Sequence, residues 1–250
     1  MRIVSRQRVL AIPLLVLCIT QGVIVHAQQP LHAQQPLSYA EVTASLVEDA
    51  PVHKGAPHIN EKQPPAVIWL MPAREGMIGP VVPGKFTLLQ KNKMFTPHLL
   101  VVPMGSSVAF PNADPFFHNV FSLFDGRRFD LGLYEAGSTR SVNFSREGVS
   151  YIFCNIHSEM SAVVISLSTP LYAIADTHRG FHLKGVPEGD YDLHVWIEGQ
   201  RQDALDHMTR RVHVSGGTAD LGEIHVARTK AGQHLNKFGR PYEPDTDPIY

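Results

Sequence analysis

The sequence predicts an all-β fold, with one Greek-key β-sandwich followed by a second, small β-sandwich. Short runs rich in Val, Ile, Phe and Tyr recur along the chain, separated by turn-forming stretches such as PNADP and DGRR. The 250 residues include 19 glycines and 19 prolines, which favour many tight turns. Helical heptads and Gly-rich phosphate-binding loops are absent from the sequence.

Residues 1–27 are predicted to be a secretory signal peptide. Arg2, Arg6 and Arg8 precede an apolar stretch, and the small-residue site VHA ends at Ala27. An uncleaved membrane anchor is the alternative, but a Gln-Gly pair interrupts the apolar run. Residues 28–37 lie within a tandem HAQQPL repeat and are expected to be a flexible leader. We therefore expect a periplasmic or secreted protein with no stable membrane span after signal cleavage.

Residues 38–82 are expected to form N-terminal strands that pack on the sandwiches. AEVTASLV alternates weakly, and AVIWLMP is a continuous apolar run typical of a strand buried on both faces. From 83 to 168, strand-like runs follow one another quickly, which predicts the first sandwich; they include KFTLLQ, HLLVVP, SSVAF, HNVFSLF, STRSVNF, VSYIFC and SAVVISLS.

The second predicted sandwich covers residues 169–228. Its strand-like runs are PLYAIAD, FHLKGV, DYDLHVWIE, TRRVHVSG and LGEIHVA. Residues 229–250 form a polar, proline-containing tail. We expect this tail to be poorly ordered or to lie over the surface.

Charge and cysteine content narrow the possible functions. The formal net charge is −1, so the chain has no basic surface that would indicate a nucleic-acid partner. Of the two cysteines, Cys18 lies in the predicted signal peptide, which leaves Cys154 alone in an oxidising compartment. An unpaired thiol there is buried and inert, reactive, or bound to a metal.

Four residues from two separated stretches form a candidate metal site. FPNADPFFHNV supplies His118, and FCNIHSEM supplies Cys154, His157 and Met160. Two imidazoles and one thiolate suit copper, and a thioether suits a weak axial bond to copper. Zinc would favour a further nitrogen, sulfur or carboxylate ligand. Taken singly, Cys154 and Met160 would each more often be core residues.

These stretches resemble the cupredoxin (plastocyanin/amicyanin-like, type 1 copper) domain. The short Cys-x2-His-x2-Met ligand loop is similar to that of amicyanins, and the similarity covers residues 83–168. The resemblance implies that His118, Cys154, His157 and Met160 bind one type 1 copper ion. It also implies that Asn119 helps to fix the ligand loop by hydrogen bonding.

The chain as a whole resembles the bacterial group described as methylamine-utilisation proteins. The stretch RGFHLKGVPEGDYDLHVW carries this similarity for residues 169–228. It implies an Ig-like module of the carboxypeptidase-regulatory type. Methylamine chemistry does not follow from these residues.

The resemblance implies a copper protein that carries single electrons between unidentified redox protein partners. Pro115, Phe116, Phe117 and Ile156 would form an apolar docking patch around His157. The alternative is a copper carrier or sensor without an electron-transfer role. An enzyme with an open copper position is a further alternative, but the sequence lacks His-x-His pairs and a Ser/His/Asp arrangement, so we predict that the chain is not an enzyme.

One face of the strand before Cys154 is unusually apolar for a sandwich that stands alone. Counting alternate residues back from Cys154 places Ile152 inward and Val149, Tyr151 and Phe153 outward. Exposed apolar faces of this kind usually contact another part of a protein. We therefore predict that this face packs against the AVIWLMP segment or the second sandwich.

Overall fold

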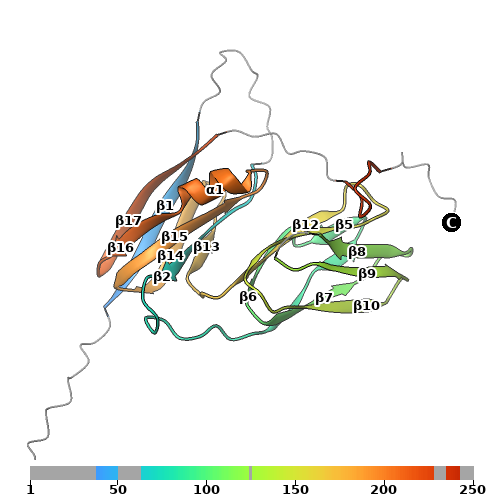
Figure 1. Ribbon diagram of the computed structural model, residues 1–250, viewed down its shortest axis with the longest axis horizontal. Coiled ribbons are helices and arrows are strands. Elements are labelled where there is room, and N and C mark those ends of the chain that lie inside the picture. The colour runs from blue at the N-terminus through green and yellow to red at the C-terminus, as the bar shows by residue number, and fades with distance from the viewer. Residues whose placement is uncertain (1–37, 50–62, 124–125, 228–234, 243–250) are drawn as a thin grey trace, which may run out of the picture. The chain divides into compact units, whose positions relative to one another are not determined.

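The computed structural model describes residues 38–49, 63–123, 126–227 and 235–242 (Figure 1). The predicted signal peptide and leader lie outside these residues, as do the stretches 228–234 and 243–250 of the tail. Apart from one short helix, the regular elements of the described residues are all strands, and these residues belong to one compact unit. The predicted all-β fold is confirmed.

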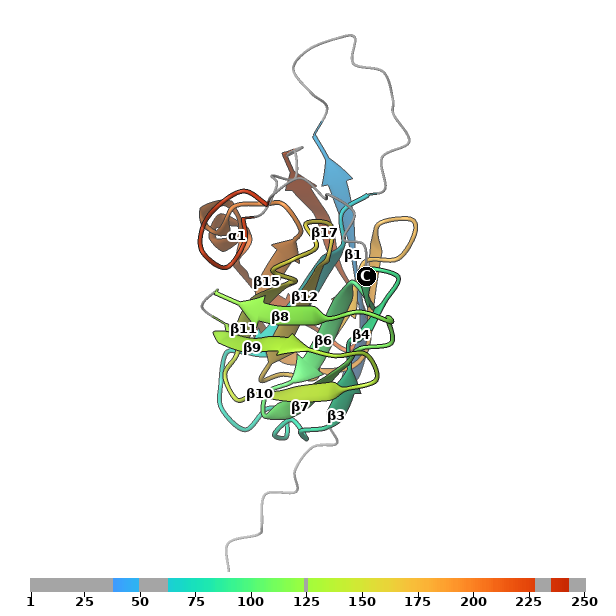
Figure 2. The same ribbon diagram turned by 90° about the vertical axis from the view of Figure 1, so that its right-hand side faces the viewer.

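The first sandwich contains a mixed five-stranded sheet, a three-stranded sheet and a short hairpin (Figure 2). The five-stranded sheet has the order β6 (Leu99–Pro103), β12 (Ser161–Leu167), β11 (Gly148–Phe153), β8 (His118–Ser122) and β9 (Phe129–Tyr134). The other sheet has the order β10 (Thr139–Phe144), β7 (Ser106–Pro111) and β3 (Lys85–Thr87). The hairpin pairs β4 (Leu89–Lys91) with β5 (Met94–Thr96).

The core of the first sandwich lies between its two sheets. Buried residues from both sheets contact one another there, among them Val108, Phe110, Val142, Ile152 and Val164. Cys154 and Met160 belong to the same cluster. These two candidate metal ligands are therefore part of a tightly packed, rigid core.

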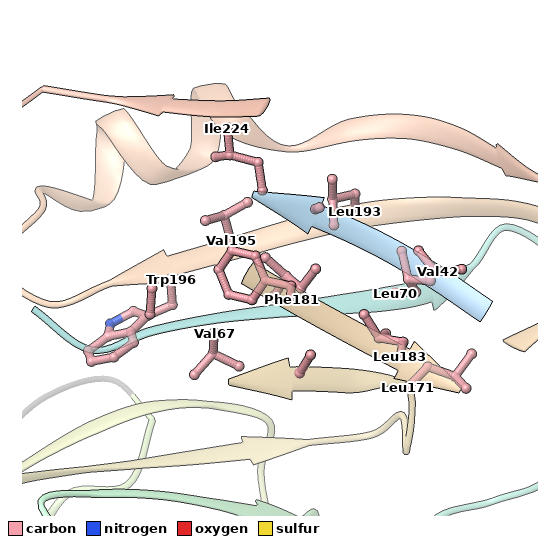
Figure 3. Close-up of a cluster of buried hydrophobic side chains, with 14 of the residues drawn as sticks. Val42, Val67, Leu70, Leu171, Phe181, Leu183, Leu193, Val195, Trp196 and Ile224 are labelled. Carbon is pink, nitrogen blue, oxygen red and sulfur yellow. The ribbon is translucent and has the colours of Figure 1, made fainter. Parts of the chain in front are cut away.

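The second sandwich contains a three-stranded and a four-stranded sheet. The first has the order β14 (Gly180–Pro187), β1 (Tyr39–Glu48) and β17 (Gly217–Val226). The second has the order β13 (Tyr172–Ile174), β2 (Ala66–Pro72), β15 (Gly189–Ile197) and β16 (Arg210–Val214), and α1 (Gln202–Met208) follows β15. Figure 3 shows the core between them, where Phe181, Leu183 and Ile224 meet Leu70, Leu193 and Val195.

The two N-terminal strands are integral members of the second sandwich. β1 pairs with β14 in antiparallel fashion and with β17 in parallel fashion. β2 lies between β13 and β15, and its consecutive residues Ala66, Val67 and Ile68 are all fully buried, so both faces of this strand are covered, as its unbroken apolar sequence requires. The sequence predicts that residues 38–82 pack on the sandwiches. In the structure, β1 is instead the middle strand of one sheet of the second sandwich. β2 is an inner strand of the other sheet.

The strands β11 and β12 of the five-stranded sheet have apolar side chains packed on both of its faces. Ile152 and Val164 point into the first sandwich, whereas Val163 and Ile165 belong to the cluster that includes the core of the second. Tyr151 packs against this second cluster, and its hydroxyl accepts a hydrogen bond of 3.2 Å from Trp196 Nε1. The prediction that the outward face packs on the second sandwich is therefore confirmed for Val149 and Tyr151, whereas Phe153 contacts Phe121 of β8.

Three described elements were not predicted from the sequence: β5, β9 and α1. In β9, Leu131 and Tyr134 both face the core although they are three positions apart, with Gly132 between them at a positive φ of 66°, so the buried residues do not follow strict alternation. α1 has a single buried residue, Leu205, and therefore carries no helical periodicity.

Among the described residues, no helix has the length and apolar character needed to cross a bilayer.

Candidate metal centre

Three predicted ligands converge at one end of the first sandwich. His118 is the first residue of β8, Cys154 directly follows β11, and His157 lies in the turn that leads to β12. The Sγ atom of Cys154 lies 3.8 Å from His118 Nδ1 and 3.5 Å from His157 Nδ1. The three ligand atoms all lie within 4.8 Å of one another, and all three residues are buried.

These separations fit a single bound ion. For metal–nitrogen and metal–sulfur bonds of about 2.0 and 2.3 Å in a planar trigonal arrangement, nitrogen and sulfur would be about 3.7 Å apart. The two sulfur–nitrogen distances, 3.8 and 3.5 Å, bracket this value. Two imidazole nitrogens and one thiolate also match the donor set that copper uses in trigonal protein sites.

The turn from Cys154 to Met160 is closed by its own backbone hydrogen bonds. The Cys154 N–H donates to the Met160 carbonyl over 3.1 Å, and the Met160 N–H donates to the His157 carbonyl over 3.1 Å. Met160 is fully buried in the same core cluster as Cys154. These bonds bring residues 154 and 160 together where β11 ends and β12 begins. The thioether of Met160 as a ligand stays a prediction.

Cys154 is fully buried. Burial raises the pKa of its thiol, and hydrogen bonds from the backbone N–H groups of Asn119, Ile156 and His157 act in the opposite direction. These three donors would stabilise a thiolate once an ion replaces the proton. The side chain of Asn119 donates instead to Asp130 Oδ1, over 2.7 Å. Its expected role in fixing the ligand loop therefore falls, in this structure, to its backbone.

Aromatic and acidic neighbours enclose the two imidazoles. The ring of Phe116 lies edge-on to His118 at 5.2 Å and tilted against His157 at 5.5 Å, measured between centroids. On its far side, His118 Nε2 lies 2.8 Å from a carboxylate oxygen of Asp114. The ring orientation of His118 is therefore fixed on both sides. Asp114 was not predicted as a site residue, although it stands four positions before His118 in FPNAD.

The C-terminal strap, which we define as residues 235–242, contacts the ligand loop. The hydroxyl of Tyr242 donates to the Cys154 carbonyl over 2.7 Å, and the Lys237 N–H donates to Asn155 Oδ1 over 3.0 Å. The Lys237 ammonium forms an ion pair with Asp130 at 2.8 Å. This part of the predicted tail thus lies over the surface and links the ligand loop to β9.

We expect Tyr242→Phe to loosen the ligand loop, because the Cys154 carbonyl loses its hydrogen bond from the strap. One such bond contributes about 0.5–1.5 kcal/mol to folding stability. Chemical denaturation should show a loss of this size, and a chelator should remove copper from the variant faster than from the unmodified chain. Tyr39→Phe is the matched control, since Tyr39 is 54% exposed. Equal behaviour of the two variants would show that the strap does not support the loop.

Comparisons with known proteins give similarity of structure only. No protein-family model matches the chain, and no curated protein sequence matches it. The bacterial subgroup and the Ig-like type expected from sequence therefore remain expectations.

Several solved cupredoxin structures match part of this chain. A purple cupredoxin from Nitrosopumilus maritimus is 22% identical, with 32% of this chain and 98% of that chain covered and a TM-score of 0.30. A reduced, singly substituted form of amicyanin is 19% identical, with 41% and 98% covered and a TM-score of 0.32. Identities and TM-scores this low carry no conclusion about what this chain does. The function proposed below therefore rests on the residues of this chain.

The prediction that this chain is not an enzyme is contradicted. A copper-containing nitrite reductase from Thermus scotoductus SA-01 also matches, at 20% identity and a TM-score of 0.32, with 50% of this chain and 28% of that chain covered. Absent local motifs were an insufficient reason to exclude catalysis, because catalytic groups can come from distant strands or from another chain.

Proposed function

We propose that this chain is a periplasmic or secreted type 1 copper protein that carries single electrons between redox protein partners. His118, Cys154 and His157 would hold one copper ion, and the thioether of Met160 would add a weaker bond to it. The convergence of three buried ligand atoms within 4.8 Å of one another carries the proposal. Copper bound there would supply one-electron chemistry by alternating between Cu(II) and Cu(I).

The residues around the site favour rapid electron exchange because they hold the ligands still. His118 starts a paired strand, Cys154 ends one, and the loop between Cys154 and Met160 is closed by backbone hydrogen bonds. A site whose ligands barely move requires little rearrangement when the charge of the ion changes. The packed core on which these strands lie supplies that rigidity.

An electron would enter and leave through the edge of the site nearest the surface. His157 is 9% exposed, and its neighbour Ile156 is 44% exposed. Phe117 is 54% exposed, and Pro115 is exposed as well. We propose that these apolar side chains form the docking patch for a redox partner, with Phe116 packed beneath them against both imidazoles.

Electrochemistry of the copper-loaded protein tests this function. We expect a reversible one-electron wave and fast self-exchange between the oxidised and reduced forms. Phe117→Asp should slow self-exchange, because it places a charge on the docking patch of both molecules, yet leave the copper spectrum unchanged. Irreversible reduction, or self-exchange too slow to detect, would contradict the electron-carrier role.

The same copper-loaded protein distinguishes an electron carrier from a copper carrier or sensor. Such a protein should release copper readily to a competing ligand and exchange electrons slowly. The buried position of all three ligand residues favours retention of the ion instead. Loss of copper to a weak competitor within minutes would therefore support the carrier function over electron transfer.

A further inference from the structure

The buried carboxylate of Asp114 is hydrogen-bonded to His118, at the ring nitrogen that faces away from the Cys154 sulfur. The Nε2–H of His118 donates to Asp114 Oδ2 over 2.8 Å, while Nδ1 of the same ring lies 3.8 Å from Cys154 Sγ. His118 is 0% and Asp114 5% exposed. The hydrogen bond fixes which nitrogen carries the proton, and so leaves Nδ1 as the lone-pair donor toward the site.

The carboxylate is itself held by a tight turn on another part of the chain. Asn92 and Lys93 join β4 to β5, and both have left-handed backbone conformations, with φ of 56° and 54°. Their N–H groups donate to Asp114 Oδ1 over 2.6 Å and to Oδ2 over 3.0 Å. Successive N–H groups arranged in this way form a binding concavity for an anion.

The backbone of Asp114 is fixed as well. Its N–H donates to Asn112 Oδ1 over 3.0 Å, and Asn112 Nδ2 donates in turn to the Phe116 carbonyl over 2.7 Å. These bonds define the shape of the loop that leads into β8. Asp114 therefore reaches His118 from a short loop that is closed by its own hydrogen bonds.

The Asp114 carboxylate accepts hydrogen bonds from three N–H groups, those of Asn92, Lys93 and His118, which is the pattern of an acceptor-only, ionised carboxylate. Burial alone would raise the pKa of Asp114, but hydrogen bonds from the Lys93 N–H, His118 and the Asn92 N–H outweigh it and hold the pKa below its usual value. These three hydrogen bonds hold the negative charge of the carboxylate one imidazole away from the candidate ion.

We infer that Asp114 is a positioning residue of the metal centre, which orients His118 and favours Cu(II) over Cu(I). The inference rests on the proposed function. A fixed negative charge in a poorly screened interior stabilises a doubly charged ion more than a singly charged one. Outer partners of this kind also make a histidine a stronger donor. Asp114 thus lowers the reduction potential and tightens the binding of Cu(II).

The test compares Asp114→Asn with Asp130→Asn. Both changes remove one negative charge near the site, but Asp130 contacts Asn119 and Lys237 and no predicted ligand. We expect Asp114→Asn to raise the reduction potential well above that of the control and to weaken Cu(II) binding about 10–100-fold. Cu(I) binding should weaken much less. Equal potentials and Cu(II) affinities in the two variants would overturn the inference.

Nitrogen-15 NMR of the unmodified, metal-free protein gives a second readout that needs no variant to fold. We expect His118 to be protonated at Nε2, with a downfield proton that exchanges slowly with solvent. A proton at Nδ1, or fast exchange, would overturn the inference whatever the copper spectra show. If the unmodified protein lacks a copper–thiolate band, the proposed function fails. If the band is present and Asp114→Asn matches Asp130→Asn, only the role of Asp114 fails.

Discussion

Cys154→Ser is expected to abolish the intense visible absorption of the copper-loaded protein and to weaken copper binding by several orders of magnitude. The sulfur is the one soft anionic ligand among the residues that converge at the site. A serine hydroxyl stays protonated at neutral pH and is a poor ligand for either oxidation state of copper. Optical spectra and competition with a chelator measure both effects.

Ser150→Ala is the matched control for this change. Ser150 lies on β11, the strand that ends just before Cys154. It is fully buried and is not among the residues that supply ligand atoms to the site. Its removal should leave the absorption band and the copper affinity unchanged. A strong visible band that survives in Cys154→Ser would show that the colour does not arise from the thiolate, and the assignment of the site would be wrong.

Ile165→Ala is expected to lower the free energy of unfolding of the whole protein by about 2–5 kcal/mol, the range typical of large-to-small core changes. Ile165 is 0% exposed and lies on β12, in the cluster that joins the five-stranded sheet to the second sandwich. Because this cluster is shared, the two sandwiches should unfold together. Denaturation followed by copper absorbance and by tryptophan fluorescence should give one midpoint.

The two probes report on different sandwiches. Trp69 and Trp196, the two tryptophans of the chain, lie on β2 and β15, whereas the metal centre belongs to the first sandwich. Val82→Ala is the control, since Val82 is 80% exposed and its truncation should cost little. Two separate transitions, with Ile165→Ala shifting only one of them, would show that the sandwiches are independent domains.

The candidate ligands could be proposed from sequence because their chemistry is local. Cys154, His157 and Met160 lie within seven residues, between two strand-like runs. His118 required a second stretch, but the register of β8 and β11 brings the ends of these strands together. The alternation of apolar residues also predicted that Tyr151 faces away from the core of the first sandwich.

The surroundings of the site could not be derived in the same way. Asp114 binds a turn at residues 92–93, and Tyr242 reaches Cys154 across 88 positions of sequence. Neither residue belongs to a repeating pattern, so only the folded chain brings them to the ligands. The same holds for β1 and β2, whose apolar runs indicate buried strands but not the sheets in which they pair.

The visible and EPR spectra of the Cu(II)-loaded protein test the central claim most directly. A thiolate and two imidazoles around one ion should give an intense sulfur-to-copper charge-transfer band and a narrow copper hyperfine splitting, at one ion per chain. A weak d–d band with a wide hyperfine splitting would mean that Cys154 is not a ligand. That result would contradict the metal centre described here.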